Sequence, residues 1–393
     1  MPSMTYEYGS DEPPEASGSR YGYAPYPNAS DDDEIESRHS ALGVNELADG
    51  EYFVEAERTY NNTTWVYRLP ADQEEVIRQD RQHYIMLAAL PGLYRGPVED
   101  ILSDRSRHRR LLDIGCGTGI WTQEMAELFP HVDCIGIDLM PLQHDHQMRN
   151  CTFMRVFAPT GLKIFGDNSF DVIHLRQMLH AVCRKASASP LTPLIRSSTG
   201  METNAHASPT GSNRSLWVSP LQTNEYPAVL REAHRMLRPG GLILIHEPQL
   251  QLHSAWEGLT HVDLTPCLAK MMDLLRGAQQ FRGIDVELFS GMDSVLVDAG
   301  FQSDAIDVYY HYRQVCAEDP ASEDGQNQAI NIVSYLHAAR LIILESGVTD
   351  EDTFDELLAG VSEEVCGRSN GRAGPLGGQG VLSPWGYWWA MKR

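Results

Sequence analysis

A glycine-rich turn between an apolar strand and a helix is the feature that most constrains this fold. The segment Asp113-Ile-Gly-Cys-Gly-Thr-Gly119 begins at the end of the apolar run 110–114. It leads into a helical pattern over 119–129. A second apolar run, 132–139, contains Asp138 near its end. Two strands joined by a helix are normally parallel, because the crossover returns the chain to the same edge of the sheet. The segment is therefore expected to form a strand–turn–helix–strand unit.

The glycines and the acid of this unit together predict a nucleoside-binding site. Gly115 and Gly117 carry no Cβ, so the backbone can turn tightly and approach a ligand closely. Gly119 begins the helix, where backbone amides have no partner within the helix. Asp138 follows the turn by about 20 residues, a spacing that lets a carboxylate accept hydrogen bonds from ribose hydroxyls. The expected ligand is a nucleoside derivative at the carboxyl ends of the strands.

The glycine spacing distinguishes between two kinds of nucleoside cofactor. A dinucleotide fingerprint places its third glycine three positions after the second. Here Gly119 lies only two positions after Gly117, and Asp113 precedes the turn. A carboxylate at this position disfavours a pyrophosphate and suits a cationic ligand, such as the amino group and sulfonium of S-adenosylmethionine. An NAD-dependent oxidoreductase is therefore the less favoured hypothesis.

The rest of the chain continues the alternation of strands and helices. Strands are expected at 151–156, 170–175, 242–245 and 306–310 and over the aromatic segment 385–392, and helices at 227–237, 263–281, 290–299, 327–346 and 351–365. Such alternation predicts an α/β fold with a largely parallel sheet and helices on both faces. Residues 51–102 are expected to form a helical lead-in, with Asp72 as a helix N-cap.

Several segments resemble the class I S-adenosylmethionine-dependent methyltransferases, and more narrowly the fungal LaeA-like methyltransferases. They are 111–121, 136–143, 167–176 and 237–247, with 67–72 and 80–83 upstream. The resemblance covers roughly residues 52–185 and 225–310 and the last strand. It implies a Rossmann-like fold whose seven-stranded, mostly parallel sheet has an antiparallel last strand.

The resemblance also implies the cofactor and the residues that hold it. S-adenosyl-L-methionine is the implied cofactor, and no metal is expected. The implied binding residues are Asp113, Gly115, Gly117, Gly119, Asp138, Leu139, Ala158 and Arg176. One departure concerns the adenine, because 155–159 lacks the acidic pair or asparagine that is common in the family. Either the cofactor affinity is weakened, or Phe157 and Ala158 contact adenine by packing and through the backbone instead.

Catalytic candidates are sought at the carboxyl ends of the fourth and fifth strands. Methyl transfer is an in-line displacement, so the main task of the enzyme is to align the acceptor and exclude water. A general base helps only where the acceptor carries a proton. His246 and His180 are the candidates for this role. For both, a buried structural histidine is the competing interpretation.

Composition suggests how the chain is divided. Residues 1–50 contain the run Asp31-Asp-Asp-Glu34 and few aliphatic residues, so we expect a disordered acidic tail. Residues 51–393 are expected to form the methyltransferase domain. The polar stretch 186–220 is expected to be a disordered insertion. Residues 311–380 are expected to be a helical insertion before the last strand.

Charge and cysteine content limit the partners and the compartment. The net charge of −23, from 54 acidic and 31 basic residues, disfavours a nucleic-acid substrate. Seven scattered cysteines without a Cys-x-x-Cys pair argue against a disulfide framework and a zinc site. No membrane span or secretory signal is expected, so the predicted location is cytoplasmic, with a nuclear one as the alternative.

The leading functional hypothesis is methylation of a small molecule, in secondary metabolism. The alternative is a LaeA-like regulatory protein that keeps the methyltransferase fold and acts through protein partners. In that case the acidic tail or the 186–220 insertion would bind the partners. Cofactor binding separates both hypotheses from an oxidoreductase, and formation of a methylated product separates the first from the second.

Overall fold

The fold is taken from a computed structural model of the chain. It describes residues 51–62, 67–90, 92–141, 143, 148–179, 183–184, 223–315, 323–366, 368–369, 372–373 and 380–393. The expected tail 1–50, the expected insertion 186–220 and His180 lie outside the described residues. The short strands β7 (Cys183–Arg184) and β8 (Thr223–Asn224) on either side of that insertion pair antiparallel.

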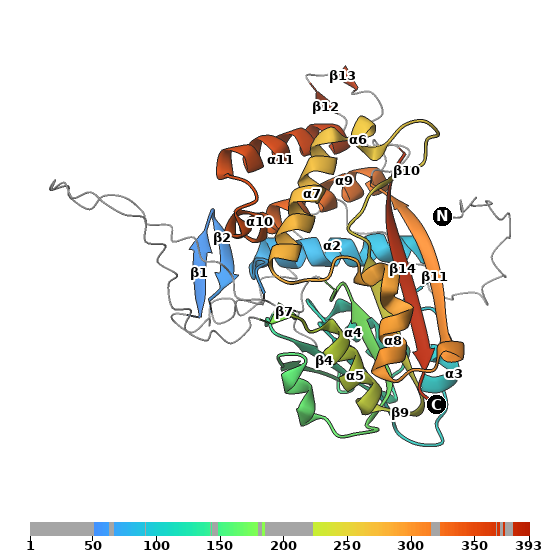
Figure 1. Cartoon of the computed structure of the whole chain (residues 1–393). Helices are drawn as coiled ribbons and strands as arrows, with labels where there is room; N and C mark the ends of the chain where they lie inside the picture. The colour runs from blue at the N-terminus through green and yellow to red at the C-terminus, as the bar shows by residue number, and fades with distance from the viewer. Residues whose placement is uncertain are drawn as a thin grey trace, which may run out of the picture.

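A central sheet confirms the expected architecture (Figure 1). Its seven long strands are β3 (Arg109–Ile114), β4 (Val132–Asp138), β5 (Cys151–Arg155), β6 (Phe170–Arg176), β9 (Leu237–Pro248), β11 (Ile306–Gln314) and β14 (Val381–Met391). The order is β5-β4-β3-β6-β9-β14, with β11 also paired to β14. The first five strands are parallel, and β14 runs antiparallel to β9 and to β11. A two-residue strand, β10 (His253–Ser254), pairs with the other end of β14.

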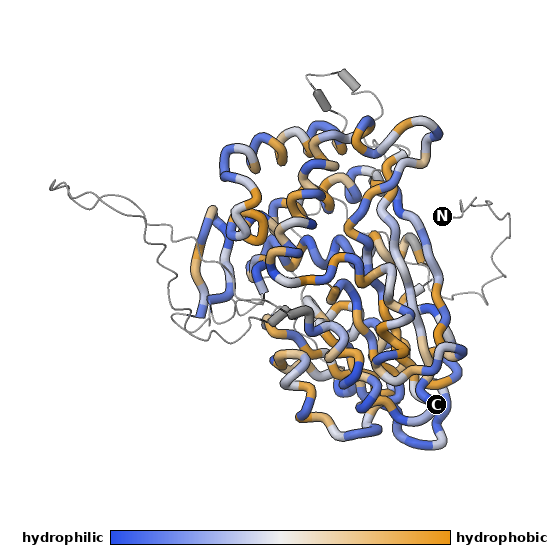
Figure 2. Tube along the Cα trace, in the orientation of Figure 1, coloured by the Kyte–Doolittle hydropathy of each residue, from blue (hydrophilic) through white to orange (hydrophobic). Residues whose placement is uncertain are grey.

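Alternating side chains bury both faces of this sheet. Leu112 and Ile173 belong to a core cluster with helices α5 (Tyr226–Met236) and α8 (Met292–Ala299). Leu111 and Val172, their neighbours in sequence, pack on the other face with α3 (Val98–Leu102) and α4 (Ile120–Leu128). Since strand side chains alternate with period two, a continuous apolar run can cover both faces. Figure 2 shows apolar residues in the surrounding helices as well as in the strands.

A second group of helices lies beyond one end of the sheet, and we call it the helical cover. It consists of α7 (Pro266–Phe281), α9 (Glu323–Ala338), α10 (Arg340–Ser346) and α11 (Glu351–Cys366). The cover has its own apolar cluster, in which Leu336, Ile343 and Phe354 are fully buried. Helix α2 (Gln73–Ala89) lies between the cover and the sheet (Figure 1). The single helix expected at 327–346 is divided into α9 and α10.

The N-terminal lead-in differs from the helical expectation. Residues 52–61 form a hairpin of β1 (Tyr52–Glu55) and β2 (Arg58–Asn61). Its turn residues, Ala56 and Glu57, have φ of 48° and 65°. Such turns normally carry asparagine or glycine, so Ala56 and Glu57 provide no hairpin signal. The expected cap of α2 is confirmed, since the Asp72 side chain accepts a hydrogen bond from the Glu75 backbone amide.

Among the helices of the described residues, none has the length and apolar character that a membrane span requires.

Candidate active site

The glycine-rich turn adopts the backbone conformation for which glycine is needed. Gly115, Gly117 and Gly119 have φ of 73°, 56° and 78°, in the left-handed region. A Cβ at Gly115 would lie 1.9 Å from the Met178 sulfur, and one at Gly117 2.4 Å from the Gln79 side-chain oxygen. Gly115 and Gly117 line a cavity, whereas a Cβ at Gly119 would meet the Phe153 ring. The first two glycines therefore serve the site, and the third serves packing against the sheet.

Asp138 lies at the carboxyl end of β4, next to this turn. Its carboxylate accepts hydrogen bonds from the backbone amides of Gly117 (2.9 Å) and Met140 (2.8 Å). These bonds fix the carboxylate at the wall of two adjoining cavities. Burial raises the pKa of Asp138 to about 6, because removal from water disfavours the charged form.

The smaller cavity is a mostly apolar slot of about 60 Å³. Its walls bring together Leu139 and Ala158, which sequence analysis had assigned to the same ligand from separate strands. Further apolar lining comes from Ile114, Ile137, Val156 and Phe157. The slot meets the larger cavity at shared residues, which are Tyr67, Gly115, Asp138 and Met178. This geometry suits a flat, weakly polar ring next to a group that hydrogen-bonds to Asp138.

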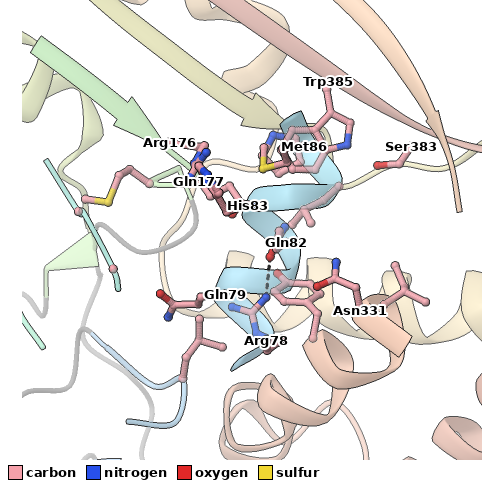
Figure 3. Close-up of a pocket in the computed structure, with 18 of the residues that line it drawn as sticks. Arg78, Gln79, Gln82, His83, Met86, Arg176, Gln177, Asn331, Ser383 and Trp385 are labelled. Atoms are coloured by element: carbon pink, nitrogen blue, oxygen red, sulfur yellow. Dashed lines mark hydrogen bonds between the residues drawn. The ribbon is translucent and has the colours of Figure 1, made fainter. Parts of the chain in front are cut away.

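The larger cavity, which we call the chamber, has a volume of about 230 Å³. It lies between the glycine-rich turn, α2, the helical cover and the ends of β11 and β14. Figure 3 shows side chains of α2, such as Gln82 and Met86, facing Asn331 of α9 and Trp385 of β14. The chamber is thus assembled from segments that are far apart in the sequence.

Arg176 and His83 form a buried pair in the chamber wall (Figure 3). The Arg176 guanidinium lies 3.1 Å from His83 Nδ1, and His83 Nε2 lies 2.8 Å from a Glu124 carboxylate oxygen. Because a guanidinium only donates, Nδ1 must accept and Nε2–H must donate to Glu124. Burial lowers the pKa of His83, as does Arg176, and both favour this neutral form. His83 thus positions Arg176, a role that sequence analysis missed although it had noted the segment 80–83.

Comparison with known proteins supports the interpretation of this geometry. Residues 86–276 match a family model described as a methyltransferase domain. The chain is 35% identical over 122 residues to the secondary metabolism regulator laeA of Aspergillus fumigatus, covering 30% of this chain and 31% of that protein. It is 33% identical over 138 residues to the protein-methionine methyltransferase laeA of Emericella nidulans, covering 35% and 36%. The matched segment thus spans about a third of the length of these curated relatives.

Residues 86–276 thus belong to a methyltransferase domain. Its cofactor is S-adenosylmethionine. Among solved structures, a putative methyltransferase from an antibiotic biosynthesis pathway of Anabaena variabilis aligns with a TM-score of 0.41 at 11% identity. That alignment covers 75% of this chain and 94% of the other.

The residues of the methyltransferase domain fit this cofactor. Gly115 and Asp138 lie at the junction of the two cavities, where Asp138 presents a carboxylate and a Cβ at Gly115 would meet Met178. The apolar slot beside Asp138 has the character that an adenine ring requires. Arg176 lines the chamber near the turn and offers donors for a carboxylate.

Asp113 is placed differently from the expectation. Its side chain is 2% exposed and lines neither cavity. One carboxylate oxygen accepts a hydrogen bond from the Thr122 hydroxyl (2.6 Å), and the other lies 2.8 Å from His174 Nδ1. The His174 ring in turn stacks on Trp121, with centroids 3.6 Å apart. Asp113 therefore connects β3, β6 and α4 behind the turn, and the expected contact with a cationic ligand is not supported.

His246 is also removed from the site to which it had been assigned. The side chain is 1% exposed, lines neither cavity, and has Nε2 3.1 Å from Nε2 of His311. Burial lowers the pKa of His246 well below its usual value, helped by His311. Residue His246 is thus a core histidine, the competing interpretation of the sequence. Its neighbour Glu247 is fully buried and accepts hydrogen bonds from the amides of Met178 and Leu179.

Within the described residues, no group of three or more histidine, cysteine or acidic side chains is arranged to hold a metal ion.

Proposed function

We propose that this protein is an S-adenosylmethionine-dependent methyltransferase that acts on a small molecule of secondary metabolism. The observation that carries the proposal is the junction of the two cavities at Gly115 and Asp138. A nucleoside in the slot would place its ribose at Asp138 and extend toward the chamber. The chamber, at about 230 Å³, adjoins this junction and lies under the helical cover. We further propose that 51–393 form one domain, located in the cytoplasm.

The residues proposed to hold the cofactor follow from this junction. Asp138 would accept the ribose hydroxyls, and the slot between Leu139 and Ala158 would hold adenine. The backbone of Gly115 and Gly117 would approach the ligand, and Arg176 would bind its carboxylate. The cofactor supplies an electrophilic methyl group on a sulfonium.

The protein's own contribution is alignment of the acceptor and exclusion of water. Residues of α9 and α10 form one wall of the chamber and would limit the access of water to the acceptor. Among its described lining residues, His83 has both ring nitrogens engaged, and burial raises the pKa of Tyr67 and of Tyr335. This environment favours an acceptor that has a free lone pair at neutral pH. His180, which lies outside the described residues, remains the proposed general base for other acceptors.

A second candidate function is a LaeA-like regulator, in the nucleus, that works through protein partners. The names of the relatives, secondary metabolism regulator and protein-methionine methyltransferase, favour it. The acidic tail 1–50 or the segment 186–220 would then contact partners.

Calorimetric titration with S-adenosylmethionine, and separately with NAD, tests the proposal. We expect the methyl donor to bind and NAD not to bind, with binding abolished in Gly117→Arg and weakened in Asp138→Ala. Gly166→Ala is the matched control, because an added Cβ there meets no atom within 4 Å. A folded protein that binds no methyl donor would overturn the proposal.

A methyl-transfer assay separates the two candidate functions. S-adenosylhomocysteine release is measured with the small-molecule fraction and with the protein fraction of a fungal extract. Product in the first fraction supports the enzyme of small-molecule metabolism. Product in the second fraction only, or in neither, supports the regulator.

A further inference from the structure

The wall of the chamber has a charge balance opposite to that of the whole chain. The chain carries 54 acidic and 31 basic residues. The described residues that line the chamber include five arginines and one acid, Asp138; the arginines are Arg68, Arg78, Arg176, Arg282 and Arg313. The chamber wall therefore carries more basic than acidic side chains, although the chain as a whole is acidic. A cavity lined by one sign of charge attracts ligands of the other sign.

Some of these arginines have protein partners that account for them. Arg78 donates two hydrogen bonds to the buried Glu75, at 2.7 and 2.8 Å, and one to Gln82. Arg68 pairs with Glu345 at 3.2 Å. Arg176 is held by His83, as described above. Arg282 donates a hydrogen bond to the Gln279 side-chain oxygen at 3.4 Å. These four arginines contribute to the architecture of the chamber and to the cofactor site.

Arg313 has no hydrogen-bonding partner of this kind among the described residues. It lies at the end of β11, and its guanidinium carbon is 5.6 Å from the centroid of the Trp385 ring. Within the part of the chain that the structure describes, no carboxylate pairs with it. Burial lowers the pKa of Arg313 to about 10. A buried charge without a counter-charge is unfavourable, so the free chamber is electrostatically incomplete at Arg313.

Three amide side chains line the same chamber as Arg313. Gln314 follows Arg313 on β11, and Gln328 and Asn331 lie three residues apart on α9, hence on one side of the helix. Their side-chain oxygens are buried and accept no hydrogen bond in the described structure. Buried acceptors without donors are costly, so they indicate hydrogen-bond donors on the ligand.

We infer that the methyl acceptor is a small organic acid with additional hydroxyl or amino groups, anchored by its carboxylate to Arg313. Gln314, Gln328 and Asn331 accept hydrogen bonds from those groups. Trp385 and Tyr335 supply aromatic faces in the same lining. The inference deepens the proposed function. That the ligand is a methyl acceptor rests on the proposed function, whereas the selectivity for an acid rests on Arg313 and the three amides alone.

Matched acid and amide probes test this selectivity on the free protein. Ligand-observed NMR gives the affinities of benzoate and 4-hydroxycinnamate and of their neutral amides, with inorganic phosphate as a third arm. We expect at least one acid to bind about tenfold more tightly than its amide, because charge-assisted hydrogen bonds are the stronger ones. The preference should disappear in Arg313→Gln, persist in part in Arg313→Lys, and be unchanged in Arg393→Gln. Arg393 is a half-exposed terminal arginine that pairs with Asp304.

Several outcomes would overturn the inference. They are equal binding of each acid and its amide, a preference that survives in Arg313→Gln, or phosphate competing as well as the carboxylates. A melting temperature of Arg313→Gln well below that of the wild type would also overturn it, because Arg313 would then be satisfied within the protein. Calorimetry with S-adenosylmethionine is run on the same samples. Its failure would remove the proposed function, while the acid and amide comparison would still be decided.

Discussion

The cofactor region and the helical cover are built in different ways. The cofactor region is nearly continuous in sequence, because β3, the turn, α4, β4 and β6 all lie within 109–176. Its key contacts use backbone atoms, such as the Gly117 amide on Asp138. The residues that line the chamber under the cover are spread over the sequence from Tyr67 to Trp385. Its contacts use side chains, above all arginines and amides.

This difference separates cofactor binding from the selection of the methyl acceptor. A backbone cradle depends on φ angles and on the absence of Cβ atoms, so it tolerates few substitutions. A chamber of side chains on helices can change its lining while the helices keep their packing. The same domain can therefore hold one cofactor while its chamber selects an acceptor. Four predictions examine how independent the two regions are.

Phe354→Ala is expected to give the largest effect, a loss of about 4 kcal/mol in the free energy of unfolding. Phe354 is fully buried in the apolar cluster of the cover, where truncation leaves a cavity. The affinity for S-adenosylmethionine should stay within about twofold of the wild type, since this cluster lies outside the cofactor region. Urea denaturation and calorimetry measure the two quantities. Ile330→Ala, at a half-exposed position on α9, is the control and should have little effect. A large loss of cofactor affinity would show that the regions are coupled.

Gly115→Val is expected to weaken S-adenosylmethionine binding about a hundredfold, or roughly 2.8 kcal/mol. A β-branched residue strongly disfavours a φ of 73°, and its Cβ would lie 1.9 Å from the Met178 sulfur. Calorimetry measures the affinity. Gly166→Val, at an exposed glycine whose added Cβ meets no atom within 4 Å, should bind normally. Unchanged binding in Gly115→Val would mean that the turn is not the cofactor cradle.

Asp113→Asn is expected to lower the free energy of unfolding by about 2 kcal/mol, because the new amide nitrogen cannot accept from a buried donor. The partners affected are Thr122 and His174. Asp133→Asn, at an exposed position on β4, is the control. Equilibrium unfolding in urea measures the change. If stability is unchanged and cofactor affinity falls instead, Asp113 contacts the cofactor as the sequence first indicated.

The affinity for S-adenosylmethionine is expected to fall about tenfold as the pH is lowered from 7 to 5, or roughly 1.4 kcal/mol. Asp138, whose pKa burial raises to about 6, must be ionised to accept both ribose hydroxyls. Asp138→Asn should abolish this pH dependence in calorimetric titrations. The stability of the free protein should change in the opposite sense. The folded state holds this proton more tightly than the unfolded chain, so its contribution to stability decreases as the pH rises from about 4 to 6. A flat affinity profile in the wild type would contradict this role of Asp138.

The strands of the sheet were predictable from the sequence, whereas the direction of two polar side chains was not. Asp113 and His246 follow or interrupt apolar strands, and the sequence does not tell whether such a side chain turns to the cleft or to the core. Both turn to the core, where Thr122, His174 and His311 satisfy them. The hairpin at 52–61 was missed because Ala56 and Glu57 give no turn signal.

The sequence by itself determined the parallel sheet, the glycine-rich turn and Asp138, because these depend on hydrophobic periodicity and on local backbone requirements. Only the tertiary structure decided that His83 holds Arg176 and that Arg313, Gln328 and Asn331 line one chamber. Such groupings join residues from separate helices and strands. They depend on how the elements pack, and no local pattern in the chain records that packing.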